Sequence, residues 1–272
     1  MSQFVKEYYN THAEQEQQRL DLPLCRIEFA STLWLINKYF PGTGRVCDVG
    51  GGTGRYTLEL LRKGYQVTLF DLSDEEIRLA GLQLQEQGLS AEQLIVGDAR
   101  NMDMLAPASF DAVLLLGPLY HILDPAGRVQ VLKEIKRILK PQGVAMIAYL
   151  NSWGLIKTGL QDFPQRYRDI SSLRLMLEAQ DFLSRDLSGF TECHWSTPDA
   201  AQREIREAGL EIVSYAGAES FASGMGLLLE KLIRDDPQAY ENILQVAAET
   251  CELAQYRDST DHLHLIARLR NT

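Results

Sequence analysis

The sequence predicts an α/β protein built on a mostly parallel sheet with helices on both faces. From about residue 44, short apolar segments alternate with helical segments, and the connections between them are short. A glycine-rich turn, GGGTG at residues 50–54, joins the first strand to the first helix of this series. Alternation of this kind is typical of parallel strands joined by crossover helices.

The first strands and helices follow from apolar runs and from residues that begin or end helices. Runs rich in Val, Leu, Ile and Phe predict strands at residues 46–49, 66–73, 93–99 and 110–117. Leu58 and Leu61 share one face of the helix after the glycine turn, and Gly64 ends it. Ser73, with Glu76 three residues later, predicts a capping box for the next helix.

The same rhythm continues with one interruption. Asp124 and Pro125 begin a helix, and Thr197 caps another that has Pro198 at its first helical position. Further strands are predicted at residues 143–150, 210–217 and 262–269. Between these elements, residues 151–196 show no strand–helix unit, and residues 218–259 have a helical texture. We therefore expect a helical lid at 1–43 and a core at 44–272 with cap insertions at about 151–196 and 218–259.

Composition excludes several classes of protein. The 272 residues are 45% hydrophobic and 24% charged, which is ordinary for a globular enzyme. The net charge of −10 gives no general field that would attract nucleic acid or an anionic membrane. The four cysteines are scattered, with neither a zinc-binding spacing nor a disulfide framework, and no signal peptide or membrane span is evident. We expect a cytoplasmic protein without a metal site.

The glycine turn predicts a ligand site. Glycines at 50, 52 and 54 let the backbone pass close to a ligand, and Asp48 stands just before them. A dinucleotide-binding fingerprint would place its third glycine where this chain has Arg55, and a carboxylate at Asp48 would repel a pyrophosphate. The pattern favours a ligand with an ammonium and a sulfonium, with a nicotinamide-dependent dehydrogenase as the rival interpretation.

Two more acidic residues follow successive strands. Asp71 ends the second strand, where a carboxylate can accept hydrogen bonds from both hydroxyls of a ribose. Asp98 ends the third, where it can bind an adenine amino group while the backbone N–H of Ala99 meets a ring nitrogen. Because open α/β sheets bind ligands at the carboxyl ends of their strands, we expect the three acids to share one site.

These motifs resemble those of a known enzyme family. In order and spacing, VCDVGGGTGRYT, LFDLS, VGDARNM and FDAVLLLGPLYHIL are similar to the motifs of class I S-adenosylmethionine-dependent methyltransferases. The resemblance covers roughly residues 44–150, 197–217 and 260–269, and GPLYHI is similar to a bacterial branch of the family. It implies a Rossmann-like fold with a seven-stranded, mostly parallel sheet whose last strand is antiparallel.

The resemblance also implies how S-adenosylmethionine would be bound. The loop would pack against the methionine part, Asp48 would hold its ammonium, Asp71 the ribose diol, and Asp98 with Ala99 the adenine. The implied cofactor-binding residues are Asp48, Gly50, Gly51, Gly52, Gly54, Asp71, Leu72, Asp98, Ala99, Arg100, Leu116 and Gly117.

The methyl acceptor is less readable from the sequence. His121 and Tyr120 follow the fourth strand and are the catalytic candidates, with His121 either a general base or a histidine packed on the next helix. Arg19 either pairs with a ligand carboxylate or pairs with Glu16 on a solvent face. The predicted acceptor pocket comprises Tyr9, His12, Tyr120, His194 and Trp195, with a rim position as the alternative for His194.

We therefore predict transfer of a methyl group to O or N of a small-molecule acceptor, with neither nucleic acid nor a membrane as partner. An RNA or protein methyltransferase and a non-catalytic S-adenosylmethionine-binding regulator remain alternatives. The oligomeric state is open.

Overall fold

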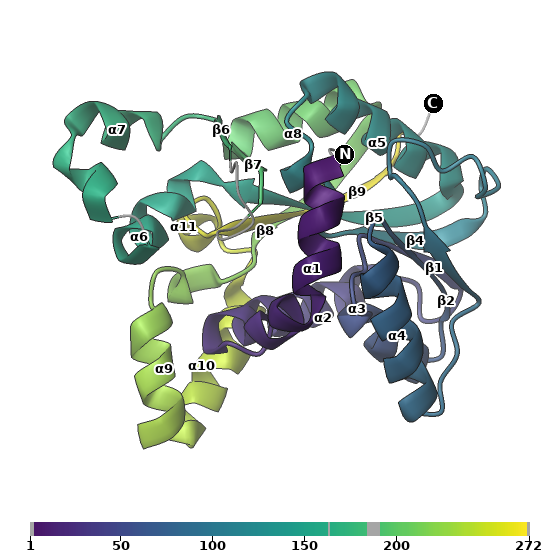
Figure 1. Ribbon diagram of the computed structural model, residues 1–272, viewed down its shortest axis with the longest axis horizontal. Coiled ribbons are helices and arrows are strands. Elements are labelled where there is room, and N and C mark those ends of the chain that lie inside the picture. Colours follow the sequence, from purple (N-terminus) through teal and green to yellow (C-terminus); the bar gives the residue numbers. More distant parts are fainter. Residues whose placement is uncertain (1–2, 163, 184–190, 271–272) are drawn as a thin grey trace.

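The computed structural model describes residues 3–162, 164–183 and 191–270, and within them one sheet contains nine strands (Figure 1). Seven strands follow the order β3 (Gln93–Val96), β2 (Gln66–Asp71), β1 (Arg45–Val49), β4 (Phe110–Leu115), β5 (Leu139–Asn151), β9 (His262–Leu269), β8 (Leu210–Gly217). β1 to β5 pair in parallel, whereas β9 lies antiparallel between β5 and β8. The predicted α/β fold with an antiparallel last strand is confirmed.

The count of seven strands is corrected by a short hairpin, β6 (Gln180–Phe182) and β7 (Cys193–Ser196). β9 borders one side of β5 along residues 144–150, so β7 pairs with Leu150 and Asn151 on the other side, beyond the end of β4. β3 is as short but has the apolar run QLIV, whereas β6 (QDF) and β7 (CHWS) have no such run in the sequence.

The segment that was expected to lack strand–helix units also contains α6 (Ser152–Asp162), η2 (Pro164–Arg168) and α7 (Ile170–Leu175). Residues 1–2 of the predicted lid, 163 and 184–190 of the first insertion, and 271–272 of the core lie outside the described residues.

Two apolar layers hold the helices on the sheet. Alternate residues of β4 point to opposite faces, so Val113 and Leu115 join one buried cluster and Ala112 and Leu114 the other. The first cluster includes α5 (Pro125–Ile138) and α8 (Pro198–Glu207), and the second includes α2 (Pro23–Tyr39) and α3 (Arg55–Arg62). α4 (Asp74–Glu86) lies on the same side as α3 (Figure 1).

The predicted helix starts at Asp124 and Thr197 are confirmed by their capping hydrogen bonds.

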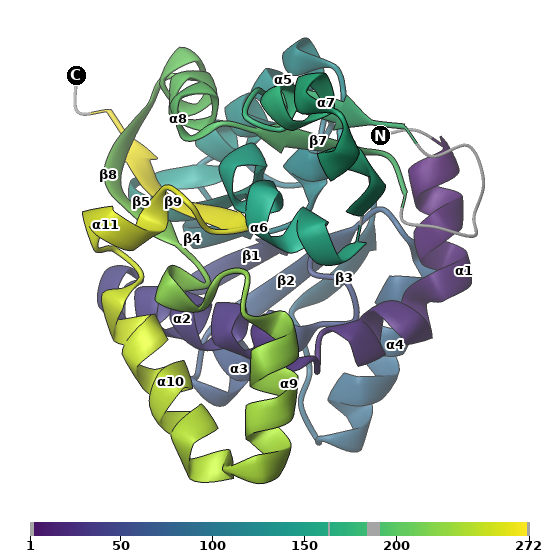
Figure 2. The same ribbon diagram turned by 90° about the vertical axis from the view of Figure 1, so that its left-hand side faces the viewer.

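The remaining helices gather around the carboxyl edge of the sheet. They are α1 (Gln3–Arg19), η1 (Pro118–His121), η3 (Ser220–Ala222), α9 (Gly226–Asp235), α10 (Pro237–Thr250) and α11 (Ala254–Arg257). α10 packs along α2, where Ile27, Leu229 and Tyr240 belong to a third apolar cluster. In Figure 2, α1, α6 and α9 surround the end of the sheet at which β1 and β2 terminate. Among the described helices, none is long and apolar enough to cross a membrane.

Candidate active site

A cavity of about 490 Å³ lies at the carboxyl edge of the sheet. Its floor is formed by the residues that follow β1, β2 and β4, and α1 and α2 contribute its opposite wall. The far end is lined by residues of α6 and β7 and by the junctions at the end of β8 and the start of β9. Cavities of roughly 300–1,000 Å³ are the usual size of small-ligand sites.

The glycine loop is held in a conformation that other residues rarely adopt. Gly50, Gly52 and Gly54 have φ values of 76°, 54° and 89°, all in the left-handed region. A Cβ on Gly50 would lie 2.4 Å from Cδ of Pro118, so the loop and the segment after β4 are in direct contact. The three glycines are therefore required by the backbone path between β1 and α3.

Asp48 lies in β1, just before the glycine loop and outside the cavity lining. Its side chain is buried, and Oδ2 accepts a hydrogen bond of 2.7 Å from the hydroxyl of Thr57. Oδ1 is buried without a hydrogen-bond partner in the described chain. Burial is the main reason that the pKa of Asp48 rises to about 6. Asp48 lies outside the cavity lining, and its orphaned oxygen is an unused acceptor beside the loop.

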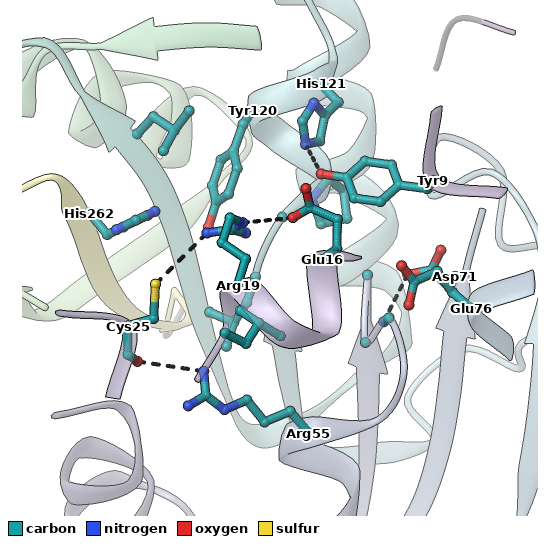
Figure 3. Close-up of a pocket in the computed structure, with 18 of the residues that line it drawn as sticks. Tyr9, Glu16, Arg19, Cys25, Arg55, Asp71, Glu76, Tyr120, His121 and His262 are labelled. Atoms are coloured by element: carbon teal, nitrogen blue, oxygen red, sulfur yellow. Dashed lines mark hydrogen bonds and ion pairs between the residues drawn. The ribbon is translucent and has the colours of Figure 1, made fainter. Parts of the chain in front are cut away.

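Asp71 lies in the cavity wall at the end of β2. Its Oδ2 accepts a hydrogen bond of 2.9 Å from the backbone N–H of Gly52 (Figure 3), and Oδ1 accepts one of 2.9 Å from that of Ser73. Burial raises its pKa. Because a carboxylate offers about four lone-pair positions, acceptor capacity remains for donors in the cavity.

The predicted capping box is only half formed. The Ser73 hydroxyl accepts a hydrogen bond of 3.1 Å from the N–H of Glu76, but the Ser73 N–H is bonded to Asp71. The Glu76 carboxylate therefore does not return to the helix end and lines the cavity instead. Burial, and secondarily the charge of Asp71, raises the pKa of Glu76 to about 8. Glu76 is a cavity residue that the sequence pattern assigned to a helix terminus.

The predicted adenine-binding pair is split. Ala99 is buried and lines the cavity, whereas Asp98 lies outside the lining and forms an ion pair of 2.7 Å with Arg100. Burial alone would raise the pKa of Asp98, but hydrogen bonds with Arg100 contribute to lowering it to about 2. Asp98 is therefore ionised. Because it is paired with Arg100, it could bind an adenine amino group only if the Arg100 side chain also lay beside the adenine.

His121 connects the cavity floor to α1. Its Nδ1 lies 2.8 Å from the carbonyl oxygen of Glu192, and its Nε2 lies 2.8 Å from the hydroxyl of Tyr9 (Figure 3). Since a carbonyl can only accept, Nδ1 carries the proton, and Nε2 accepts the hydrogen bond from Tyr9. Burial lowers the pKa of His121 to about 4, so the ring is neutral. Nε2, the nitrogen that could act as a base, is therefore already bonded to Tyr9 of α1.

Tyr9→Phe should loosen α1. The substitution removes one hydrogen bond, worth about 1 kcal/mol, so we expect amide hydrogen exchange in α1 to accelerate about fivefold. Hydrogen exchange read by mass spectrometry checks this. Tyr240→Phe is the control, because that hydroxyl donates to the carbonyl of Pro23 on α2 and does not touch α1. Unchanged exchange in Tyr9→Phe would contradict the tie between Tyr9 and His121.

The far end of the cavity contains acidic residues and a histidine that the sequence analysis did not single out. Glu219 Oε1 lies 2.6 Å from Nδ1 of His262, and Oε2 accepts hydrogen bonds from the backbone N–H groups of Asp261 and His262. Burial alone would lower the pKa of His262, but Glu28 and Glu219 outweigh it and raise that pKa to about 10. His262 is therefore an imidazolium held between carboxylates.

The cavity brings together most of the predicted site residues. Those in its lining are Tyr9, Gly50, Gly51, Gly52, Asp71, Leu72, Ala99, Leu116, Gly117, Tyr120, His121 and Trp195. Outside the lining are His12, Asp48, Gly54, Asp98, Arg100 and His194. His12 stacks on Tyr8, and His194 pairs with Asp181, each away from the cavity. Arg19 lines the cavity and also pairs with Glu16 at 2.7 Å.

Comparisons with known proteins point to one family. A family model described as a methyltransferase domain matches residues 46–143. A tRNA 5-carboxymethoxyuridine methyltransferase of Escherichia coli O157:H7 is 26% identical over 225 residues, covering 82% of this chain and 79% of that protein. A ubiquinone biosynthesis O-methyltransferase of Xylella fastidiosa is 36% identical over 119 residues, covering 43% of this chain and 46% of that protein. The second match spans less than half of either chain.

Solved structures share the fold. A Burkholderia thailandensis 1,6-didemethyltoxoflavin-N1-methyltransferase, whose structure contains S-adenosylhomocysteine, has a TM-score of 0.60 at 16% identity and covers 98% of this chain and 88% of its own. A methyltransferase of Methanosarcina mazei has a TM-score of 0.59 at 21% identity, covering 87% and 98%. The matched segment contains the glycine loop, Asp71 and Ala99. Residues 46–143 therefore form a methyltransferase domain, and the chain is an S-adenosylmethionine-dependent methyltransferase with the fold of the solved methyltransferase structures.

Proposed function

We propose that this enzyme transfers a methyl group from S-adenosylmethionine to O or N of a small-molecule acceptor. The observation that carries the proposal is one continuous cavity that extends from the glycine loop to the polar end formed by Glu219 and His262. Its volume of about 490 Å³ and its position beneath α1 suit a cofactor beside a compact acceptor.

The residues in the wall fit the cofactor by their chemistry. When bound, S-adenosylmethionine supplies an electrophilic methyl group on a sulfonium. Asp71 would accept hydrogen bonds from the ribose diol, and the loop at 50–54 would lie against the methionine part. Ala99 and Leu72 would contact the adenine, while the unpartnered Oδ1 of Asp48 is an acceptor beside the loop that would suit an ammonium.

His121 acts as a positioning residue in this proposal. Its Nε2 is bonded to Tyr9, so the residue holds α1 over the cavity as a lid. Tyr120, which lines the cavity between His121 and His262, would contact the acceptor. Alignment of acceptor and methyl donor can supply up to about 7–11 kcal/mol of the barrier, so positioning alone can carry much of the rate.

A tRNA acceptor is the second candidate. The chain is similar over most of its length to a tRNA methyltransferase, so the expectation that nucleic acid is not a partner lacks support from the comparisons. The net charge of −10 favours the small molecule. We also propose a cytoplasmic location, which suits four free cysteines.

A transfer assay separates the two acceptor classes. The protein is incubated with S-adenosylmethionine labelled on its methyl group and with either total tRNA or the small-molecule fraction of a bacterial extract. We expect label in the small-molecule fraction, accompanied by S-adenosylhomocysteine. Label in tRNA alone would replace the proposal by the RNA alternative, and binding without transfer to either fraction would favour a non-catalytic regulator.

A further inference from the structure

We propose that the far end of the cavity is a subsite for a basic amino group, so that the acceptor of this enzyme is an organic amine anchored by Glu28. The proposal deepens the small-molecule function above and rests on it. Glu28 lies on α2, lines the cavity and keeps 17% of its side-chain surface exposed there.

The Glu28 carboxylate has unused acceptor capacity. Oε2 lies 3.8 Å from Nδ1 of His262, and Oε1 lies 3.9 Å from Nε2 of His264. Both distances exceed a hydrogen bond. Within the described chain, no group donates a hydrogen bond to this carboxylate. A carboxylate in a cavity wall with its acceptors unsatisfied is suited to an N–H donor from a ligand.

The neighbouring side chain of His264 does not donate a hydrogen bond to the Glu28 carboxylate. The Thr32 hydroxyl donates its one proton to the carbonyl oxygen of Glu28 at 2.8 Å, so Nδ1 of His264, 3.5 Å from that hydroxyl, must be the donor of their contact. In the neutral ring, Nε2 then carries a lone pair. This nitrogen is fully buried, has no hydrogen-bond partner and faces Glu28. Two acceptors thus face each other with no donor between them.

Acidic groups outnumber cations in the cavity lining at this end. Glu28 and Glu219 line it together with Asp261, whose pKa burial raises to about 7, and His262 is the cation in the lining, while Lys157 of α6 lies outside the lining near Asp261 and Glu219. Asp261 accepts hydrogen bonds from the hydroxyls of Thr158 and Ser223. In the part of the chain that the structure describes, no lysine or arginine forms an ion pair with any of these three carboxylates. A cationic ligand would offset the excess of negative charge at this end of the cavity.

The two arginines of the cavity are committed elsewhere. Arg19 donates to Glu16, and Arg55 lies 4.1 Å above the ring of Phe29 and donates to the carbonyl oxygen of Cys25 (Figure 3). Neither supplies the charge that Glu28 lacks.

An ammonium suits this subsite better than a metal ion. Glu28, Glu219 and His262 place one ligand atom each within 4.8 Å of one another, which is metal-like spacing. However, Nδ1 of His262, which lies 3.8 Å from Glu28, already shares a hydrogen bond of 2.6 Å with Glu219. An ammonium uses the free acceptors of Glu28 and leaves that bond intact. Tyr120 and Trp195 line the same cavity and give apolar surface to the rest of the acceptor.

Calorimetric titration of the S-adenosylhomocysteine complex tests the proposal. The probes are matched amines and alcohols, phenethylamine against 2-phenylethanol and butylamine against butanol, and Mn²⁺ or Zn²⁺ alone. We expect each amine to bind at least about tenfold more tightly than its alcohol, as a charge-assisted hydrogen bond requires. Glu28→Gln should bring the ratio close to one. Glu241→Gln, which changes an exposed carboxylate on α10, should leave it unchanged.

Equal affinity for amines and alcohols, no binding of any amine at 10 mM, or a preference that persists in Glu28→Gln would each overturn the proposal. Binding of Mn²⁺ or Zn²⁺ that is lost in Glu28→Gln would replace the amine by a metal. If Glu28→Gln does not fold, Glu28→Asp and the amine-to-alcohol ratio of the unmodified enzyme still decide. Failure of S-adenosylhomocysteine itself to bind would instead refute the proposed function.

Discussion

Replacing Asp71 by asparagine is expected to weaken the binding of S-adenosylhomocysteine about 100-fold. The Asp71 carboxylate lines the cavity with acceptor positions left over, and there we propose the ribose diol. Each hydrogen bond to a charged group contributes about 1.5–3 kcal/mol, and asparagine removes one of the two acceptor oxygens and the charge from the other, so the cost is about 3 kcal/mol. Asparagine also turns an N–H₂ group toward the backbone N–H of Gly52 or Ser73, which loosens the loop.

A ligand series separates the loop effect from the ribose effect. Calorimetry with S-adenosylhomocysteine and its 2′,3′-dideoxy analogue measures how much the enzyme gains from the diol. The unmodified enzyme should prefer the natural ligand strongly, and Asp71→Asn should show little preference. Glu92→Gln serves as the control, because Glu92 pairs with Arg45 on the surface. A variant that binds both ligands weakly but keeps the full preference would show that Asp71 acts on the loop alone.

The cofactor half of the site could be predicted because its residues follow strand ends. Parallel strands place their carboxyl ends at one edge, so Gly50, Asp71 and Ala99 had to converge once the strand pattern was recognised. The glycines are readable because the backbone there adopts positive φ, which few other residues tolerate. Side-chain direction was not readable in the same way, and Asp48, Asp98 and Arg100 lie outside the lining.

The acceptor half depends on contacts between segments far apart in the chain. Glu28 lies in a mostly apolar stretch of α2 that gives no hint of a cavity, and the partner of His121 is Tyr9, 112 residues away. One signal was available. Because the last strand was predicted to be antiparallel, its first residue, His262, had to lie at the cofactor edge beside the end of β8, where Glu219 follows.

Replacing Glu219 by glutamine should destabilise the protein by about 3–5 kcal/mol, which is the usual cost of removing one partner of a buried ion pair. The Glu219 side chain is 2% exposed and is bonded to the ring of His262 and to two backbone N–H groups. Urea unfolding measures the loss. Glu92→Gln, which breaks an exposed pair, should change the free energy of unfolding by about 0–1 kcal/mol.

The pH dependence identifies the ion pair as the cause. The pKa of His262 is about 10 in the folded protein and 6.5 as its ordinary value, so the folded state binds a proton that the unfolded state has lost between these limits. The stabilisation is therefore complete below pH 6.5 and is lost as the pH rises toward 10.

Glu76 and Asp261, whose pKa values are raised to about 8 and about 7, add a decline of the same sign. Glu76 adds it equally in both proteins, whereas His262 and Asp261, whose pKa values the charge of Glu219 helps to raise, contribute in full only in the unmodified protein. The difference in free energy of unfolding between the unmodified protein and Glu219→Gln should thus shrink as the pH rises from 6.5 to 10. A difference independent of pH would mean that Glu219 stabilises the fold through its backbone hydrogen bonds alone.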